Sequence, residues 1–288
     1  MKDLKYIFYG TGPLAEAALY SLYHAGLIPV AIVTKPDSPI GRHQTMTEPI
    51  IKTWSKSKDI LILQPTSLKD ENNILNIFFK ENKIDLSIVA SYGKIIPESL
   101  LSIPKYGTLN IHPSMLPLYR GPSPIESQLL DGATSIGLSI MALDAGMDSG
   151  PVYVQTQIPT PIGDWNTETL ERICGRAGAE LIVQILIFII EGTLKPIAQD
   201  HDKATFCKFI KKEQGEIQYP IDVSELKKKW HALRPWPGIF FFIKHADKEM
   251  RVKINNIDTA TSTVLRVTPE GKKEMDWESF ERGYCAVT

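Results

Sequence analysis

The chain has 288 residues, of which 43% are hydrophobic and 23% charged, and its formal net charge is −1. These values are typical of a globular protein and exclude wholesale disorder and a fibrous architecture. The most hydrophobic run, residues 181–190, is too short to span a bilayer, and no secretory signal is expected at the start. Three separated cysteines without a CxxC pair disfavour disulfides and a cysteine-based metal site, so we expect a cytoplasmic protein without membrane contact.

The first part of the chain alternates short hydrophobic runs with helical stretches. Helices are predicted at about 13–25 and 72–83, and strands at 6–9, 30–33, 60–63, 86–90 and 108–111. This order predicts an α/β fold with a Rossmann-like parallel sheet and helices on both faces. Ligands of such sheets lie outside the carboxyl ends of the strands, so we expect the functional residues in the loops that follow the strands.

After residue 135 the pattern changes. Residues 136–143 and 152–158 alternate like an antiparallel pair, and Thr167 is expected to cap a long helix that ends at Gly192. Short strands at 240–243, 250–254 and 263–267 then predict a small β-rich domain. We therefore expect a catalytic domain at 1–191, a linker at 192–206 and a C-terminal domain at 207–288.

A glycine motif, Gly10-Thr-Gly-Pro-Leu-Ala15, follows the first strand and opens the first helix. It fits the dinucleotide-binding fingerprint, with Asp37 near the acidic position, so an NAD-dependent oxidoreductase is one alternative. The other interpretation is structural, because a tight strand-to-helix turn needs glycines. This interpretation is favoured, because Pro13 removes an N–H that a pyrophosphate would need and Asp37 lies in a Pro-rich loop.

Most candidate functional residues lie in the segment 110–121, which reads Asn-Ile-His-Pro-Ser-Met-Leu-Pro-Leu-Tyr-Arg-Gly. Residues two apart on a strand point to the same side, so Asn110 and His112 are expected to project together at the carboxyl end of the fifth strand. An amide donor beside an imidazole suits oxyanion stabilisation and proton transfer. The loop at 143–150 adds Asp144 and Asp148, and either carboxylate could orient His112. No histidine spacing typical of a metal site is present, and no metal is expected.

Together these motifs resemble those of the folate-dependent formyltransferases. The form Asn-x-His-Pro-Ser-x-Leu-Pro-x-Tyr-Arg-Gly, followed by Leu-Asp-x-Gly-Met-Asp-x-Gly, is most similar to the methionyl-tRNA formyltransferase family. Weaker matches follow in the right order at 34–42, 91–97, 234–238 and 271–275. The resemblance implies a Rossmann-like formyltransferase domain and a shortened, β-barrel-like (OB-type) C-terminal domain that contacts tRNA.

The resemblance also implies a reaction and the residues that carry it. A formyl group would pass from 10-formyltetrahydrofolate to the amino group of methionyl-initiator tRNA, in translation initiation. Asn110 and His112 would donate to the oxyanion, and Asp148 would orient His112 and collect the amine proton. Arg42 would contact the tRNA, and the enzyme is expected to be a monomer. The folate pocket would be lined by residues of two loops, namely Tyr92, Ile95, Ser114, Met115, Leu116 and Pro117.

Other functions remain open at the level of the sequence. A formyltransferase acting on a small amine, such as a nucleotide-linked amino sugar, would share Asn110, His112 and Asp148, and the short C-terminal domain favours it. The loop at 36–42 and the motif at 234–238 favour tRNA instead. A non-catalytic RNA-binding protein on the same scaffold is a third possibility. Arg120 could pin the loop after His112 or face the acceptor stem.

Overall fold

The computed structural model describes residues 4–40, 44–68, 74–245 and 248–285. Its contacts divide the chain into two compact units. The N-terminal unit comprises Met1–Pro124, Ser135–Ile158 and Glu171–Cys207, and the C-terminal unit comprises Ile125–Thr134, Pro159–Leu170 and Lys208–Thr288. Two segments from the middle of the chain therefore pack with its last part. The predicted domains are continuous stretches of the chain, with boundaries at 191 and 206, and these boundaries stay a prediction.

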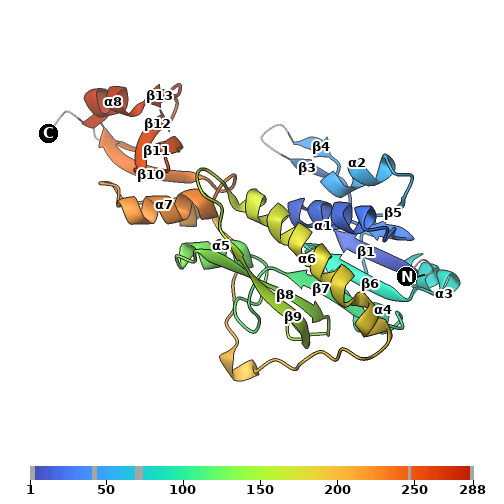
Figure 1. Cartoon of the computed structure of the whole chain (residues 1–288). Coiled ribbons are helices and arrows are strands. Elements are labelled where there is room, and N and C mark those ends of the chain that lie inside the picture. The colour runs from blue at the N-terminus through green and yellow to red at the C-terminus, as the bar shows by residue number, and fades with distance from the viewer. Residues whose placement is uncertain (1–3, 41–43, 69–73, 246–247, 286–288) are drawn as a thin grey trace. The chain divides into compact units, whose positions relative to one another are not determined.

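A seven-stranded sheet forms the centre of the N-terminal unit, in the order β5-β2-β1-β6-β7-β8-β9 (Figure 1). The strands are β1 (Tyr6–Gly10), β2 (Ala31–Val33), β5 (Leu61–Leu63), β6 (Leu86–Ala90), β7 (Thr108–His112), β8 (Ser135–Ala142) and β9 (Val152–Pro159). The first five in the spatial order are parallel, and β8 pairs with β7 antiparallel. Every residue of β1, β2, β6 and β7 is buried, as expected for central strands covered on both faces. The predicted parallel α/β fold is confirmed.

Helices cover both faces of this sheet. They are α1 (Pro13–His24), α2 (Ile50–Lys56), α3 (Ile74–Asn82), α4 (Glu98–Leu101) and most of α6 (Thr167–Ile190). The short η1 (His201–Lys203) lies in the segment that follows α6. Ile7 and Tyr9 pack into one core cluster with Phe79 of α3 and Leu100 of α4. Figure 1 shows α1 and α6 lying across the sheet. A hairpin that the sequence did not predict, β3 (Ser38–Ile40) with β4 (Thr45–Thr47), follows β2.

Helix α6 extends the hydrophobic run at 181–190 into a longer element. By length and composition it has what a membrane-crossing helix needs, although 39% of its most hydrophobic window is buried in the protein. Two glycines bring it against its neighbours: a Cβ on Gly175 would lie 2.3 Å from the Leu14 oxygen, and one on Gly178 2.4 Å from Ile111 Cγ2. These contacts with α1 and β7 are those of a core helix.

The beginning of α6 corrects one expectation. Thr167 does not cap the helix: its hydroxyl donates to the carbonyl oxygens of Ala232 (2.7 Å) and His231 (3.3 Å). Asn166 caps instead, because its Oδ1 accepts from the Thr169 N–H at 3.0 Å. Both residue types cap helices, and a tertiary contact with the end of α7 (Val223–Ala232) decided between them.

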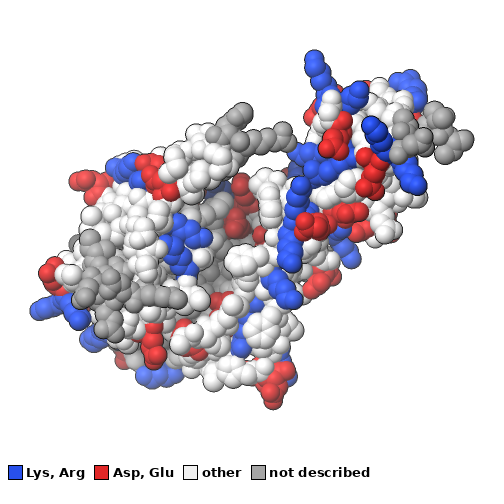
Figure 2. Space-filling model, turned by 180° about the vertical axis from the view of Figure 1, so that it is seen from behind, with Lys and Arg blue, Asp and Glu red and all other residues white. Residues whose placement is uncertain are grey.

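The C-terminal unit contains a four-stranded antiparallel sheet in the order β10-β11-β12-β13. Its elements are α5 (Pro124–Leu130), η2 (Lys212–Gly215), α7 (Val223–Ala232), β10 (Ile239–His245), β11 (Lys248–Asp258), β12 (Thr263–Pro269), β13 (Met275–Asp276), α8 (Trp277–Phe280) and η3 (Glu281–Cys285). Trp230, Phe241 and Phe280 lie fully buried in its core cluster. The three predicted strands are present, and β13 adds a fourth. Figure 2 shows basic and acidic side chains interspersed on the visible face of this unit.

Candidate active site

Strand β7 positions the two residues that the sequence places at its carboxyl end. Asn110 lies between Val89 of β6 and Met141 of β8, and His112 lies opposite Ser139 of β8. Their exposed fractions are 8% and 4%. Because strand residues alternate, both side chains project from the same face. No group among the described residues hydrogen-bonds the Asn110 amide, which leaves its donors available to a ligand.

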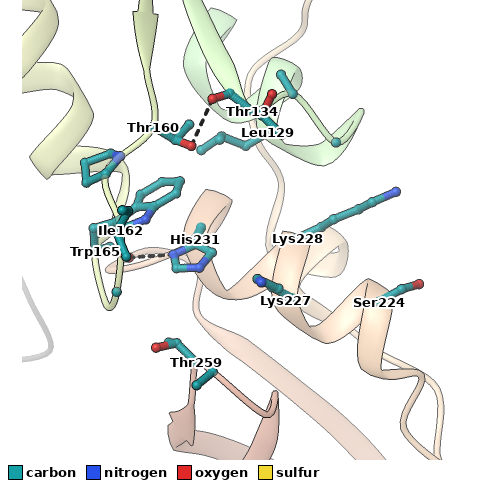
Figure 3. Close-up of a pocket in the computed structure, with 15 residues that line it drawn as sticks. Leu129, Thr134, Thr160, Ile162, Trp165, Ser224, Lys227, Lys228, His231 and Thr259 are labelled. Carbon is teal, nitrogen blue, oxygen red and sulfur yellow. Dashed lines mark hydrogen bonds between the residues drawn. The ribbon is translucent and has the colours of Figure 1, made fainter.

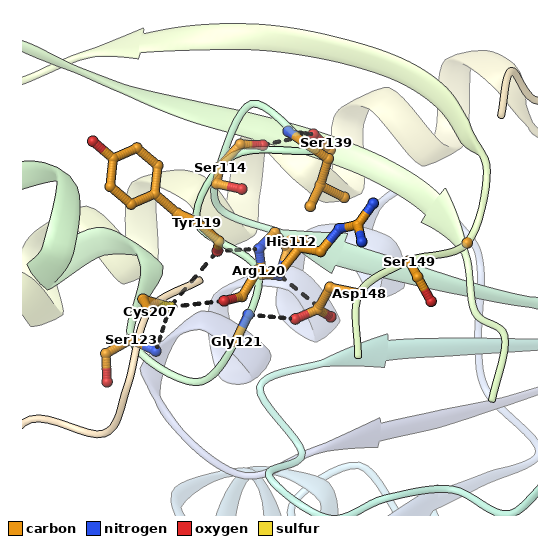
Figure 4. A network of polar contacts seen from close by, with 12 residues as sticks. His112, Ser114, Tyr119, Arg120, Gly121, Ser123, Ser139, Asp148, Ser149 and Cys207 are labelled. Carbon is orange, nitrogen blue, oxygen red and sulfur yellow. Dashed lines mark hydrogen bonds and ion pairs between the residues drawn. The ribbon is translucent and has the colours of Figure 1, made fainter. Parts of the chain in front are cut away.

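Contacts at both ring nitrogens fix the imidazole of His112 (Figure 4). Its Nε2 lies 3.1 Å from the Tyr119 carbonyl oxygen, and its Nδ1 lies 3.6 Å from Asp148 Oδ1. A carbonyl oxygen only accepts, so Nε2 carries a proton and donates it. The Nδ1 nitrogen therefore faces the carboxylate, and 3.6 Å is an ion-pair distance longer than a direct hydrogen bond. Nδ1 is the nitrogen left for chemistry.

The structure chooses between the two candidate acids. Asp148 faces His112 and accepts a hydrogen bond from the Gly121 N–H at 2.8 Å on its other oxygen, Oδ2. Asp144 turns back into its own loop, where Oδ1 accepts from the Gly146 N–H (3.0 Å) and the Ser149 hydroxyl (2.8 Å). The backbone of Asp148 has φ +48°, a left-handed conformation that non-glycine residues rarely adopt. Such conformations cluster at functional sites.

Strand β8 cradles the loop that leaves β7. The Ser139 hydroxyl donates to the Ser114 carbonyl at 2.6 Å and accepts from the Leu116 N–H at 3.2 Å. Gln155 of β9 donates to the Leu116 carbonyl at 2.8 Å and to the Ser139 oxygen at 2.9 Å. A Cβ on Gly137 would lie 2.2 Å from the Met115 nitrogen, so this position requires glycine. The sequence pattern did not predict the roles of Gly137, Ser139 and Gln155, and its only signal for them is the Gly-x-Ser spacing at 137–139.

The predicted folate-pocket residues lie in different environments. The Ser114 hydroxyl is used within the loop, where it donates to the Leu118 carbonyl at 2.6 Å. Tyr92 is 2% exposed and packs edge-on against Tyr9, and burial raises its pKa to about 12. Ile95 is 85% exposed. Both residues lie in the loop that follows β6, beside β7, and their place in the folate pocket stays a prediction. Leu116 is buried, and Met115 and Pro117 belong to the same loop as Ser114.

Arg120 pins the loop after His112. It is 4% exposed, and its guanidinium donates to Gln199 Oε1 from Nε (3.1 Å) and Nη2 (2.7 Å). Nη2 also lies 3.0 Å from Nδ1 of His201, which must accept because a guanidinium only donates. Because the side chain is buried and three of its five donors are bonded within the protein, we infer that Arg120 holds the loop and does not face the acceptor stem. Arg42, the residue predicted to contact tRNA, lies outside the described residues.

The glycine motif is accounted for by packing. A Cβ on Gly10 would lie 2.4 Å from the Ala15 Cβ and 2.9 Å from the Ala90 oxygen, so glycine permits the close approach of β1, α1 and β6. Asp37 accepts from Gln64 (2.9 Å) and Lys52 (2.8 Å), and these two bonds hold the pKa of its carboxyl below the usual range. Its carboxylate is therefore already engaged, which favours the structural interpretation of the motif.

A separate pocket of about 620 Å³ lies within the C-terminal unit (Figure 3). Its walls come from the loop after α5, the loop at 160–165, helix α7 and the turn at 259–260. Trp165 stacks on His231 at 4.0 Å, and His231 Nδ1 donates to the Trp165 carbonyl at 3.0 Å. Lys227 and Lys228 line the pocket without a carboxylate among the lining residues. None of the predicted catalytic residues is part of it.

Known proteins match the chain over almost its whole length. Residues 4–186 match the formyl transferase family, and residues 209–264 match the formyl transferase C-terminal domain. The methionyl-tRNA formyltransferase of Chloroflexus aurantiacus is 38% identical over 242 residues, covering 83% of this chain and 76% of that protein. That of Dictyoglomus thermophilum is 33% identical over 308 aligned positions, covering 98% of this chain and 97% of that protein.

A solved structure has the same fold. The methionyl-tRNA formyltransferase from Clostridium thermocellum superposes with a TM-score of 0.57 at 16% identity, over 95% of this chain and 99% of that chain. The resemblance drawn from the central motif is thereby confirmed. The chain belongs to the formyl transferase family, and within that family to the methionyl-tRNA formyltransferases.

Proposed function

We propose that this formyltransferase transfers the formyl group of 10-formyltetrahydrofolate to the amino group of methionyl-initiator tRNA. The observation that carries the proposal is the juxtaposition of Asn110, His112 and Asp148 at the carboxyl end of β7, in a chain of this family. Asn110 brings an amide to which none of the described residues hydrogen-bonds, and His112 and Asp148 bring a proton-handling pair. We also propose that the enzyme acts as a cytoplasmic monomer, without a metal ion.

The chemistry follows from these groups. The neutral amine attacks the formyl carbon, which forms a C–N bond and a tetrahedral intermediate with an oxyanion. The Asn110 amide donates to this oxygen, where a preformed donor contributes about 3 kcal/mol. Asp148 Oδ1 accepts the proton of the attacking nitrogen, directly or through a water. In its doubly protonated form, His112 can donate to the oxyanion or, like a water, protonate the folate nitrogen as its bond to the formyl carbon breaks. Nδ1 would do this, because Nε2 is held by Tyr119.

The two aspartates of one loop provide a matched test. Asp148→Asn keeps an oxygen for the Gly121 N–H but removes the charge beside His112, so turnover should fall on the order of 100-fold or more. Asp144→Asn keeps the acceptor for Gly146 and should retain most of the activity. Asn110→Ala should lower turnover on the order of 100-fold. Near-normal turnover of Asp148→Asn or Asn110→Ala would contradict the mechanism.

The substrate is tested by formyl transfer to Met-charged initiator tRNA, with an amino-sugar nucleotide assayed in parallel. Efficient transfer to the tRNA supports the proposal. Transfer only to the small amine would keep the three catalytic residues and replace the substrate. An NADH-fluorescence titration would expose a dehydrogenase, if neither acceptor is formylated.

A further inference from the structure

The segment after α6 returns to the active site and places one buried amide there. Ile197 exchanges two backbone hydrogen bonds with Val152, each 2.8 Å. Gln199 follows and is 9% exposed. Its Nε2 donates to the carbonyl oxygens of Asp148 (2.9 Å) and Gly150 (2.6 Å), and its Oε1 accepts twice from Arg120. Two donors and two acceptor sites are all that a glutamine amide has, so the side chain is fully used.

The loop that Gln199 holds has an unfavourable backbone. Asp148 has φ +48°, and such a conformation persists only where the surroundings determine it. Next to it, a Cβ on Gly150 would lie 1.9 Å from the Ala142 oxygen, so the loop is pressed against the end of β8. The two carbonyls that Gln199 binds, those of Asp148 and Gly150, belong to this tightly packed part of the loop. Gln199 therefore supplies the donors that keep the loop in place.

The other end of the contact is rigid. The Arg120 N–H donates to the Thr205 carbonyl (2.9 Å), the Arg120 carbonyl accepts from the Cys207 N–H (2.8 Å), and the Arg120 side chain is buried. The next residue, Gly121, donates its N–H to Asp148 Oδ2. Asp148 is thus held at its backbone through Gln199 and at Oδ2 through Gly121. Oδ1 is left to face His112, as Figure 4 shows for the pair.

We propose that Gln199 is a positioning residue: it fixes the Asp148 loop so that Oδ1 meets His112 Nδ1. The kinetic test of this inference rests on the proposed function. A second test observes the His112 imidazole directly and does not depend on that function. Gln199 acts through Asp148, to whose carbonyl it donates, and Asp148 in turn faces His112. The amide is required because both donors are needed, and an acid at this position would satisfy Arg120 alone.

The substitution Gln199→Glu separates these two demands. It keeps the size of the side chain and the partner of Arg120, but it turns an acceptor oxygen toward the carbonyls of Asp148 and Gly150. A displacement of the catalytic carboxylate by about 1 Å lowers turnover on the order of 100-fold. We expect kcat to fall 10- to 100-fold, with KM for both substrates within about twofold because Gln199 is buried and its amide is bonded to protein groups. Gln184→Glu, the same change on the exposed side of α6, should behave like the wild type.

The second readout needs no substrate. The imidazole NMR signals of His112 should shift in Gln199→Glu in the same direction as in Asp148→Asn, and should stay in place in Gln184→Glu. Gln199→Met, which carries no charge, replaces Gln199→Glu if that variant does not fold. If Gln199→Glu has the kcat of the wild type and unshifted His112 signals, the inference is overturned. A lower melting temperature with unshifted His112 signals would overturn it as well. If the wild type formylates neither acceptor, the proposed function fails, and the His112 signals alone decide the role of Gln199.

Discussion

Removal of the Ser139 hydroxyl should destabilise the N-terminal unit and loosen the loop after His112. This fully buried hydroxyl makes three hydrogen bonds: it donates to Ser114 and accepts from Leu116 and Gln155. At a net value of about 1 kcal/mol for each bond, Ser139→Ala should lower the free energy of unfolding by about 3 kcal/mol. For a domain of roughly 150–250 residues, this corresponds to a melting temperature lower by roughly 6–12 °C.

Calorimetry and urea titration followed by circular dichroism would measure both quantities. The control is Ser135→Ala, a half-buried position at the start of the same strand, for which we expect a change within about 0.5 kcal/mol. The loop of residues 114–117 is a predicted wall of the folate pocket, so KM for the folate donor should rise more than kcat falls. A Ser139→Ala protein as stable as the control would refute the view that β8 holds this loop.

Three further outcomes follow from single contacts. Asn166→Ala removes the cap of α6 and should cost about 1 kcal/mol of unfolding free energy, whereas an unchanged free energy would return the cap to Thr167. Gly178→Ala places a methyl group against Ile111 and should cost about 1–3 kcal/mol, which thermal unfolding would detect or contradict. Burial lowers the pKa of His231, so the unfolded chain binds protons more readily below about pH 6.5. Stability should therefore fall from pH 7.5 to 5.5. Melting curves of His231→Gln should show a smaller fall over the same range, and an equal fall would exclude His231 as the cause of the pH dependence.

The sequence by itself determined the parallel sheet and the edge at which the predicted catalytic residues lie. Central strands buried on both faces are mostly hydrophobic, so β1, β2 and β6 are visible as short hydrophobic runs, whereas β7 alternates hydrophobic and polar residues. Strand alternation then puts Asn110 and His112 on one face without any knowledge of distant contacts. The motif residues around Asn110 and His112 were specific enough to indicate the family, and the known relatives confirm this assignment.

Only the tertiary structure decided what meets these residues. The loop with Asp144 and Asp148 offers two acids, and the choice depends on Gly121 and His112, which lie far away in the sequence. Gln199 carries no sequence signal at all, because a buried amide is recognised by its partners and not by its neighbours along the chain. The cap of α6 was decided in the same way, by a contact with α7. Local preferences specify elements, whereas hydrogen-bond partners across 50 residues or more depend on how those elements pack.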